Sequence, residues 1–101
     1  MHLTQQSPQQ PICPGDEVVY LCTLPGNALL WGTPVGDFAV LDSFETPSMG
    51  GYVARKVQYD SINNCLTANL TFFAVNRTLI TCQNSARSLR NSTVVGTEGT
   101  V

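Results

Sequence analysis

The chain has 101 residues, of which 43% are apolar and only 12% are charged, and its formal net charge is −2. A chain of this length forms one domain, and the absence of any run of Lys or Arg argues against nucleic acid or an acidic membrane surface as a partner. No apolar run approaches the 18 residues typical of a membrane-spanning helix. We therefore expect a small globular domain that meets a membrane only through other parts of a longer chain.

The chain opens with MHLTQQSPQQ, which has neither the basic segment nor the apolar segment of a secretory signal peptide. We expect residues 1–9 to be a flexible lead-in and residues 1–101 to form a single domain of a longer ectodomain. The one histidine, His2, lies in this lead-in, so no histidine cluster is available for catalysis or for a metal. We expect no enzyme activity, no metal and no cofactor.

Alternating apolar and polar residues predict β-strands along the rest of the chain. The pattern is found in DEVVYLCTL (16–24), VARKVQY (53–59), CLTANLTFF (65–73) and TLITC (78–82). Gly- and Pro-containing turn signals separate these segments, and no segment has a sustained helical period. Seven or more short strands at this spacing indicate an all-β fold, either a two-sheet sandwich or a small barrel.

Four cysteines, Cys13, Cys22, Cys65 and Cys82, indicate disulfides, because the count is even and the chain is short. Zinc is the alternative ligand, but it requires closely spaced pairs such as C-x-x-C. The nearest two cysteines here are nine residues apart, which disfavours a zinc site.

Three N-x-S/T triplets, which begin at Asn69, Asn76 and Asn91, are acceptors for N-linked glycosylation. Asn69 lies between the inward residues Ala68 and Leu70, so its side chain is expected to point to solvent. We expect glycans on Asn69 and Asn76, while Asn91 precedes the last strand and one or two of the triplets could be ordinary loop sequence. Together with the cysteines, the triplets predict a glycoprotein that is secreted or lies on the extracellular side of the plasma membrane.

Trp31 follows Cys22 by nine residues, and Cys82 occupies an inward position of a late strand. An inward Cys, an inward Trp one strand later and a late inward Cys resemble an immunoglobulin domain. The resemblance covers nearly the whole chain and implies a two-sheet Greek-key β-sandwich of variable or intermediate type. It also implies a disulfide between Cys22 and Cys82 that joins the two sheets, with Trp31 packed on it.

Parity then leaves Cys13–Cys65 as the leading second pairing. The expected strand lengths oppose it, because they place the two residues some 20 Å apart, whereas a disulfide requires Cα atoms within about 7 Å. The two cysteines could instead be free or bridge to a neighbouring domain or chain.

The chain also departs from the immunoglobulin pattern. Where many such domains have D-x-G-x-Y-x-C before the second Cys, residues 76–82 are NRTLITC, so the tyrosine corner is absent. The joining-segment motif F-G-x-G is absent as well. The chain therefore resembles a divergent module of a cell-surface receptor rather than an antibody domain, and CPGDEVVYLC (13–22) with the N-x-T-x-I-x-C ending also resembles ectodomains of sponge receptor tyrosine kinases. Leu66 follows Trp31 by 35 positions, which leaves room for strands C, C′, C″ and D, with 37–42 as C′.

The resemblance implies a recognition module for cell adhesion or self/non-self recognition, acting by contact with a protein partner, of which a second copy of the chain is one candidate. A glycan on Asn69 would cover one sheet, so we expect the opposite sheet to bind. Alternation turns Leu30, Gly32, Thr81 and Gln83 outward on that sheet, and we expect them to form the interface. A carbohydrate-binding β-sandwich and a structural spacer in a multi-domain ectodomain are the alternatives.

Overall fold

The protein is described by a computed structural model that covers residues 2–7, 11–41, 48–75 and 77–96. Within these residues the chain forms nine strands and no helix: β1 (His2–Ser7), β2 (Glu17–Pro25), β3 (Ala28–Thr33), β4 (Gly36–Leu41), β5 (Ser48–Met49), β6 (Tyr52–Asp60), β7 (Cys65–Phe73), β8 (Arg77–Asn84) and β9 (Arg90–Gly96). The predicted all-β class is confirmed. Accordingly, the described residues contain no helix long and apolar enough to cross a membrane.

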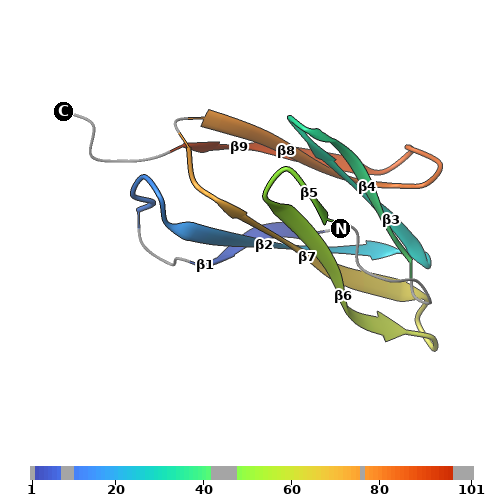
Figure 1. The fold of residues 1–101 in the computed structure, drawn as a ribbon. Helices are drawn as coiled ribbons and strands as arrows, with labels where there is room; N and C mark the ends of the chain where they lie inside the picture. The colour runs from blue at the N-terminus through green and yellow to red at the C-terminus, as the bar shows by residue number, and fades with distance from the viewer. Residues whose placement is uncertain (1, 8–10, 42–47, 76, 97–101) are drawn as a thin grey trace.

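The strands form two antiparallel sheets that lie one over the other (Figure 1). The five-stranded sheet has the order β1-β2-β7-β6-β5, and the four-stranded sheet has the order β4-β3-β8-β9. Strands β2 and β7 pair in unbroken register from Glu17–Phe73 to Pro25–Cys65. Each sheet therefore contains central strands that are distant in sequence, in addition to local hairpins.

The core lies between the two sheets and is built from the alternate residues of each strand. In β2 and β7 every second residue is fully or nearly fully buried, as the alternation predicted. The largest fully buried side chains are Trp31, Phe72, Leu24, Leu29 and Leu66. The rings of Phe72 and Tyr52 stack with centroids 5.1 Å apart, which joins β6 to β7 inside the core.

Residues 2–7 are not a lead-in as expected, because they form strand β1 at the edge of the five-stranded sheet. Leu3 pairs with Cys22 and packs against the core, and Gln5 pairs with Tyr20. The Tyr20 hydroxyl donates a hydrogen bond of 3.2 Å to Gln5 Oε1. The polar composition of this segment concealed the strand, since an edge strand places only a few side chains in the core.

The pairing of Cys13 with Cys65 is wrong, because both cysteines are free. Cys13 lies in the turn before β2, and Gly15 in that turn donates a hydrogen bond to the carbonyl of Ala74, just beyond the end of β7. Cys65 is the first residue of the same strand. The length of a nine-residue strand, about 25 Å, therefore separates the two thiols, which excludes a disulfide within the chain.

Between β4 and β6, the structure has the short strand β5, which pairs with β6 in the five-stranded sheet. Strand β4 covers the predicted strand at 37–42 with a shift of one residue. Among the described residues, only β3 pairs with β4, so β4 is the edge of the four-stranded sheet there. Residues 42–47 of this region lie outside the described residues.

Candidate binding surface

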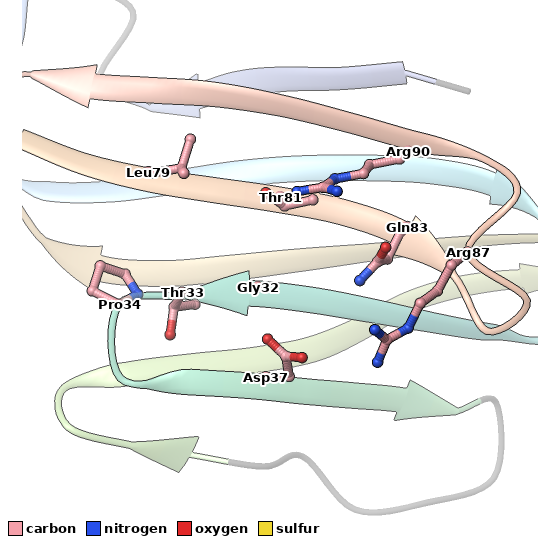
Figure 2. Close-up of a pocket in the computed structure, with 9 residues that line it drawn as sticks. All are labelled: Gly32, Thr33, Pro34, Asp37, Leu79, Thr81, Gln83, Arg87 and Arg90. Atoms are coloured by element: carbon pink, nitrogen blue, oxygen red, sulfur yellow. The ribbon is translucent and has the colours of Figure 1, made fainter.

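The outer face of the four-stranded sheet contains a hollow of about 560 Å³ (Figure 2). We call it the outer hollow; it is lined by Gly32, Thr33, Pro34, Asp37, Leu79, Thr81, Gln83, Arg87 and Arg90. These residues come from all four strands and from two of their connections. This part of the outer face is therefore concave. On a sheet whose outward positions all had large side chains, those side chains would occupy the same space.

The floor of the hollow consists of small or uncharged residues on the two central strands, β3 and β8. Gly32 pairs with Thr81, and Leu30 pairs with Gln83. A Cβ atom added at Gly32 would lie 3.4 Å from Cβ of Thr81 and 3.5 Å from Oδ1 of Asp37. The missing side chain of Gly32 thus accounts for part of the depth of the hollow.

Thr81 and Gln83 are buried, with 7% and 8% of their surfaces exposed, although they face away from the core. The Thr81 and Ser92 hydroxyls share a hydrogen bond of 3.0 Å across β8 and β9. The Gln83 side chain points into the hollow in Figure 2. The structure gives it no hydrogen bond with any described residue. The amide is not among the buried polar atoms of the described residues that lack a partner, so it meets solvent in the hollow and can bond to a ligand there.

Three charged side chains surround this floor. Asp37 stands on β4, Arg90 begins β9, and Arg87 lies in the loop between β8 and β9. Figure 2 shows the Arg87 side chain extending over the hollow toward the side on which Asp37 lies, and the Arg90 guanidinium beside Thr81. The hollow therefore has two cationic groups on one side and one carboxylate on the other.

The β8–β9 loop holds Arg87 in place through Asn84. The Asn84 amide oxygen accepts a hydrogen bond of 3.1 Å from the Leu89 backbone N–H, and the Asn84 amide nitrogen donates one of 2.9 Å to Ser88 Oγ. Arg87 has φ of 60°, a left-handed conformation that is uncommon outside glycine. The Arg87 N–H donates to the Asn84 carbonyl at 3.0 Å, which closes the turn. Asn84 thereby fixes the direction in which Arg87 leaves the sheet.

The opposite end of the hollow is apolar. Leu79 on β8 is 54% exposed and lines the hollow together with Pro34. Its cross-strand partner on β9, Val94, is 49% exposed. Two large aliphatic side chains side by side on a solvent-facing sheet provide an apolar margin next to the charged groups.

Three of the four residues expected at the interface line the hollow, namely Gly32, Thr81 and Gln83. Leu30 faces the same side of the sheet but is half-buried and lies outside the hollow lining. The hollow is also lined by Asp37, Leu79, Arg87 and Arg90, which were not among the expected interface residues. The two arginines three residues apart in SARSLR (85–90) were the available signal. Arg87 falls in the turn of the hairpin that ends the sheet, and Arg90 is the first residue of the strand that follows.

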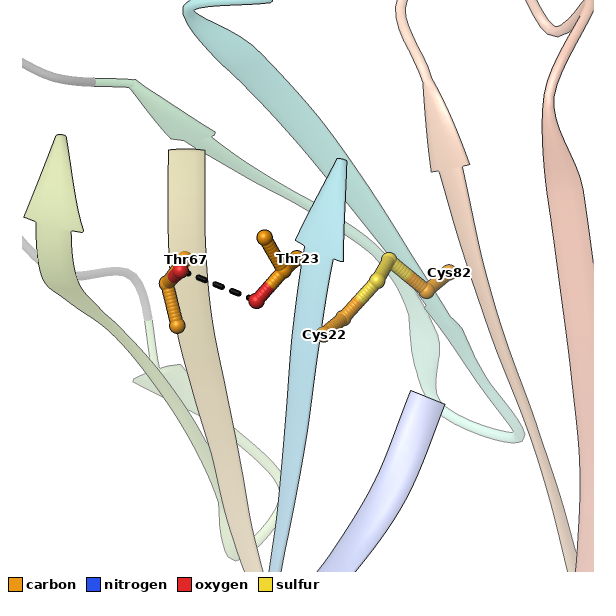
Figure 3. Close-up of a disulfide and its surroundings, with 4 residues drawn as sticks. All are labelled: Cys22, Thr23, Thr67 and Cys82. Carbon is orange, nitrogen blue, oxygen red and sulfur yellow. Dashed lines mark hydrogen bonds between the residues drawn. A yellow bond between two sulfur atoms is a disulfide. The ribbon is translucent and has the colours of Figure 1, made fainter. Parts of the chain in front are cut away.

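Cys22 and Cys82 form the expected disulfide, with Cα atoms 6.5 Å apart (Figure 3). It links β2 of one sheet to β8 of the other, and both cysteines are fully buried. Trp31 pairs with Cys82 on the neighbouring strand and is also fully buried. On the other side of β2, facing outward, Thr23 and Thr67 share a hydrogen bond of 2.9 Å. The disulfide joins the two sheets behind the outer hollow, and the threonine pair links two strands within the five-stranded sheet.

The glycosylation triplets lie on different parts of the molecule. Asn69 faces outward on β7, between Leu21 and Arg55 of the adjacent strands, and is half-buried with a buried Oδ1 atom. Asn91 is exposed and belongs to β9, where it pairs with Cys82, rather than preceding the strand. Asn76 lies outside the described residues.

The titratable groups with shifted pKa values, Asp60 and Tyr20, do not line the outer hollow. The described residues contain no group of three or more His, Cys, Asp or Glu that could hold a metal ion. The pKa of Asp60 is lowered, chiefly by the hydrogen bond from the Asn63 side chain, in the turn between β6 and β7. Burial raises the pKa of the Tyr20 phenol, and a hydrogen bond with Thr93 opposes part of that increase.

Comparisons of the chain with models of protein families, with curated proteins and with solved structures found no match. The function is therefore interpreted from the geometry of the fold and of the outer hollow.

Proposed function

We propose that the chain is an immunoglobulin-like recognition module of a cell-surface receptor or adhesion protein, which binds a protein partner through the outer face of the four-stranded sheet. The single observation that carries this proposal is the outer hollow, with its uncharged floor, charged rim and apolar margin. Interfaces typically combine such an uncharged centre with a polar rim.

The strand order supports the immunoglobulin-like class. The order β1-β2-β7-β6 corresponds to strands A, B, E and D, and β4-β3-β8-β9 corresponds to C′, C, F and G. The disulfide joins the strands that correspond to B and F, and the buried Trp31 stands on the strand that corresponds to C. Ile80, which is fully buried, occupies the place of the usual tyrosine, so the module is a divergent one.

The five-stranded sheet is the less suitable face for a partner. Its outward residues include Asn69 within a glycosylation triplet and the threonine pair Thr23–Thr67. An oligosaccharide on Asn69 would prevent close packing over the middle of that sheet. A disulfide-linked domain with such triplets fits an extracellular or secreted location.

A carbohydrate-binding function is less favoured, because sugar sites commonly present an exposed aromatic ring. None of the residues that line the outer hollow is aromatic, and Trp31 is fully buried. A pure spacer does not require a concave face into which an unpaired amide and two unpaired guanidinium groups point. The recognition function therefore accounts for more of the surface than either alternative.

The experiment is a binding screen with a tetrameric form of the domain against an array of extracellular proteins from the source organism and against the domain itself. Leu79→Asp alters the exposed apolar margin and is expected to abolish binding to any protein that the wild type recognises. Val57→Asp is the matched control, since Val57 is 51% exposed on β6 of the other sheet. Both variants should keep the wild-type melting temperature.

Loss of binding with Val57→Asp but not with Leu79→Asp would contradict the choice of face. Binding to no protein and no self-association would favour the spacer function, and specific binding to a glycan array would favour the carbohydrate-binding function.

A further inference from the structure

We infer that the outer hollow recognises a single carboxylate, an aspartate or glutamate side chain of the protein partner, which is held by Arg87, Arg90 and the amide of Gln83. This inference rests on the proposed function, since it names the chemistry that the same face would recognise.

The charge of the hollow is opposite in sign to that of the chain. Two of the five Lys and Arg residues line it, whereas only one of the seven Asp and Glu residues does. The remainder of the chain is therefore more acidic than the formal net charge of −2 indicates. A positive, concave site on an acidic domain attracts an anionic group to that site in particular.

The N–H donors of the Arg87 and Arg90 guanidinium groups are unpaired in the described part of the chain. The structure gives neither guanidinium an ion pair or hydrogen bond with a described residue. A guanidinium presents several N–H donors in a planar fork that matches a carboxylate. Because Arg87 is fixed by its left-handed turn and the Asn84 hydrogen bonds, part of the ordering needed for binding is already in place.

Gln83 adds an independent observation at the centre of the site. It is 8% exposed, its amide has no partner among the described residues, and it points into the hollow between the two arginines and Asp37 (Figure 2). A carboxylate seated there would accept from the Gln83 amide and the two guanidinium groups together. The ligand would thus bond to an amide that the fold leaves unpaired at the bottom of the hollow.

Asp37 limits the charge of the ligand. With Asp37 opposite two arginines, the hollow carries about one net positive charge, which one carboxylate balances. A phosphate group, which carries nearly two negative charges, would leave about one negative charge unbalanced beside Asp37. The apolar margin of Leu79 and Pro34 favours an amino-acid side chain with a neighbouring apolar residue over a sugar acid.

The experiment is an NMR titration of the ¹⁵N-labelled domain with N-acetyl-L-glutamate N-methylamide, which presents one glutamate side chain without charged termini. The expected result is saturable shifts of the Gln83 side-chain amide and of the Arg87 and Arg90 Nε–H signals. The isosteric glutamine derivative should leave these signals unchanged. Raising the ionic strength should weaken the binding, because the attraction is electrostatic.

Arg87→Gln and Arg90→Gln should each weaken glutamate binding about tenfold, which is the size expected for one charge-assisted hydrogen bond. Arg77→Gln is the matched control: it changes the charge equally, but Arg77 is an exposed residue at the far end of β8. Equal effects of all three variants would show that only the overall charge matters and would overturn the inference.

Equal shifts with the glutamine derivative, or shifts that map away from Gln83, would also overturn it. Stronger binding of N-acetylneuraminic acid methyl glycoside than of the glutamate derivative would assign the carboxylate to a glycan and reject the protein side chain. A partner whose binding is lost with Leu79→Asp but kept with Arg87→Gln and Arg90→Gln would leave the proposed function intact and refute the carboxylate. Glutamate binding by a domain that has no Leu79-dependent partner would support the carboxylate site and contradict the proposed function.

Discussion

The two faces of the four-stranded sheet are built from the same strands but from alternate residues, and they differ in almost every physical property. The inner face presents large apolar groups, such as Trp31 and Ile80, in a filled core. The outer face presents Gly32, Thr81 and Gln83 around a hollow. A displacement of one residue along β3 or β8 therefore separates groups that hold the fold together from groups that line the hollow.

The two faces differ in how completely their side chains fill the space beside the sheet. Filling the inner face excludes water and stabilises the domain, because buried apolar area supplies the main favourable free energy. Leaving the outer face unfilled forgoes that stabilisation but keeps a recess with unpaired polar groups. Substitutions on the inner face should change stability, and those on the outer face should change binding.

The largest expected effect comes from Trp31→Ala on the inner face. Truncating a fully buried Trp should lower the free energy of unfolding by about 3–5 kcal/mol. Urea denaturation followed by circular dichroism measures the change. Because Trp31 Nε1 is buried without a hydrogen-bond partner, Trp31→Phe should cost much less. A loss below about 1 kcal/mol for Trp31→Ala would mean that the ring is not part of the packed core.

Removal of the disulfide is expected to have a comparable effect. The bridge closes a separation of 60 residues, which corresponds to about 4 kcal/mol of unfolded-state entropy. The double variant Cys22→Ala/Cys82→Ala should show this loss in urea denaturation. The matched control Cys13→Ser/Cys65→Ser should leave stability nearly unchanged because both thiols are free. A large loss in the control would contradict the free state of these cysteines.

A smaller effect is expected from Tyr20→Phe, on the inner face of the other sheet. It removes the hydrogen bond to Gln5, at a cost of about 1 kcal/mol. The pKa of Tyr20 is raised in the folded state, so its contribution to stability is complete below the unfolded pKa of about 10. That contribution is lost as the pH rises through the folded pKa. The decline in wild-type stability at alkaline pH should therefore be smaller in Tyr20→Phe, and an equal decline would contradict the shift.

The smallest expected effect has the opposite sign and belongs to the outer face. Gly32→Ala adds a Cβ in ordinary contact with Thr81 and should raise the free energy of unfolding by roughly 0.5 kcal/mol, because glycine weakens strands. The same methyl group partly fills the hollow, so binding of the glutamate derivative should weaken. Increased stability with unchanged binding would mean that the floor around Gly32 does not touch the ligand.

The sequence was sufficient to predict most of the fold. The alternation in residues 65–73 predicted β7 with its observed bounds, and the inward positions of Cys22 and Cys82 agree with the disulfide. The edge strand β1 was missed, because its polar residues carry a weak periodic signal. In β6 the register shifts between Lys56 and Gln58, so simple alternation did not identify Tyr52 and Ala54 as the buried residues.

The candidate site was predictable only in part. Alternation placed Gly32, Thr81 and Gln83 on the outer face, but period two says nothing about whether an outward residue is exposed. Thr81 and Gln83 are buried because their neighbours cover them. Arg87 reaches the hollow through a left-handed turn that depends on Asn84, and such tertiary placement leaves no periodic trace in the sequence.

The strand order also bears on the rate of folding and on the oxidation of the four thiols. The hairpins β3–β4, β6–β7 and β8–β9 have short connections, whereas the contact between Thr23 of β2 and Thr67 of β7 spans 44 residues. Non-local pairing of this kind gives folding times of about milliseconds to seconds. The native alignment of Cys22 with Cys82 requires β2 and β8 to lie in facing sheets, which depends on the β2–β7 and β3–β8 pairings. During folding four thiols compete for oxidation, so replacing Cys13 and Cys65 by serine should raise the yield of correctly oxidised protein.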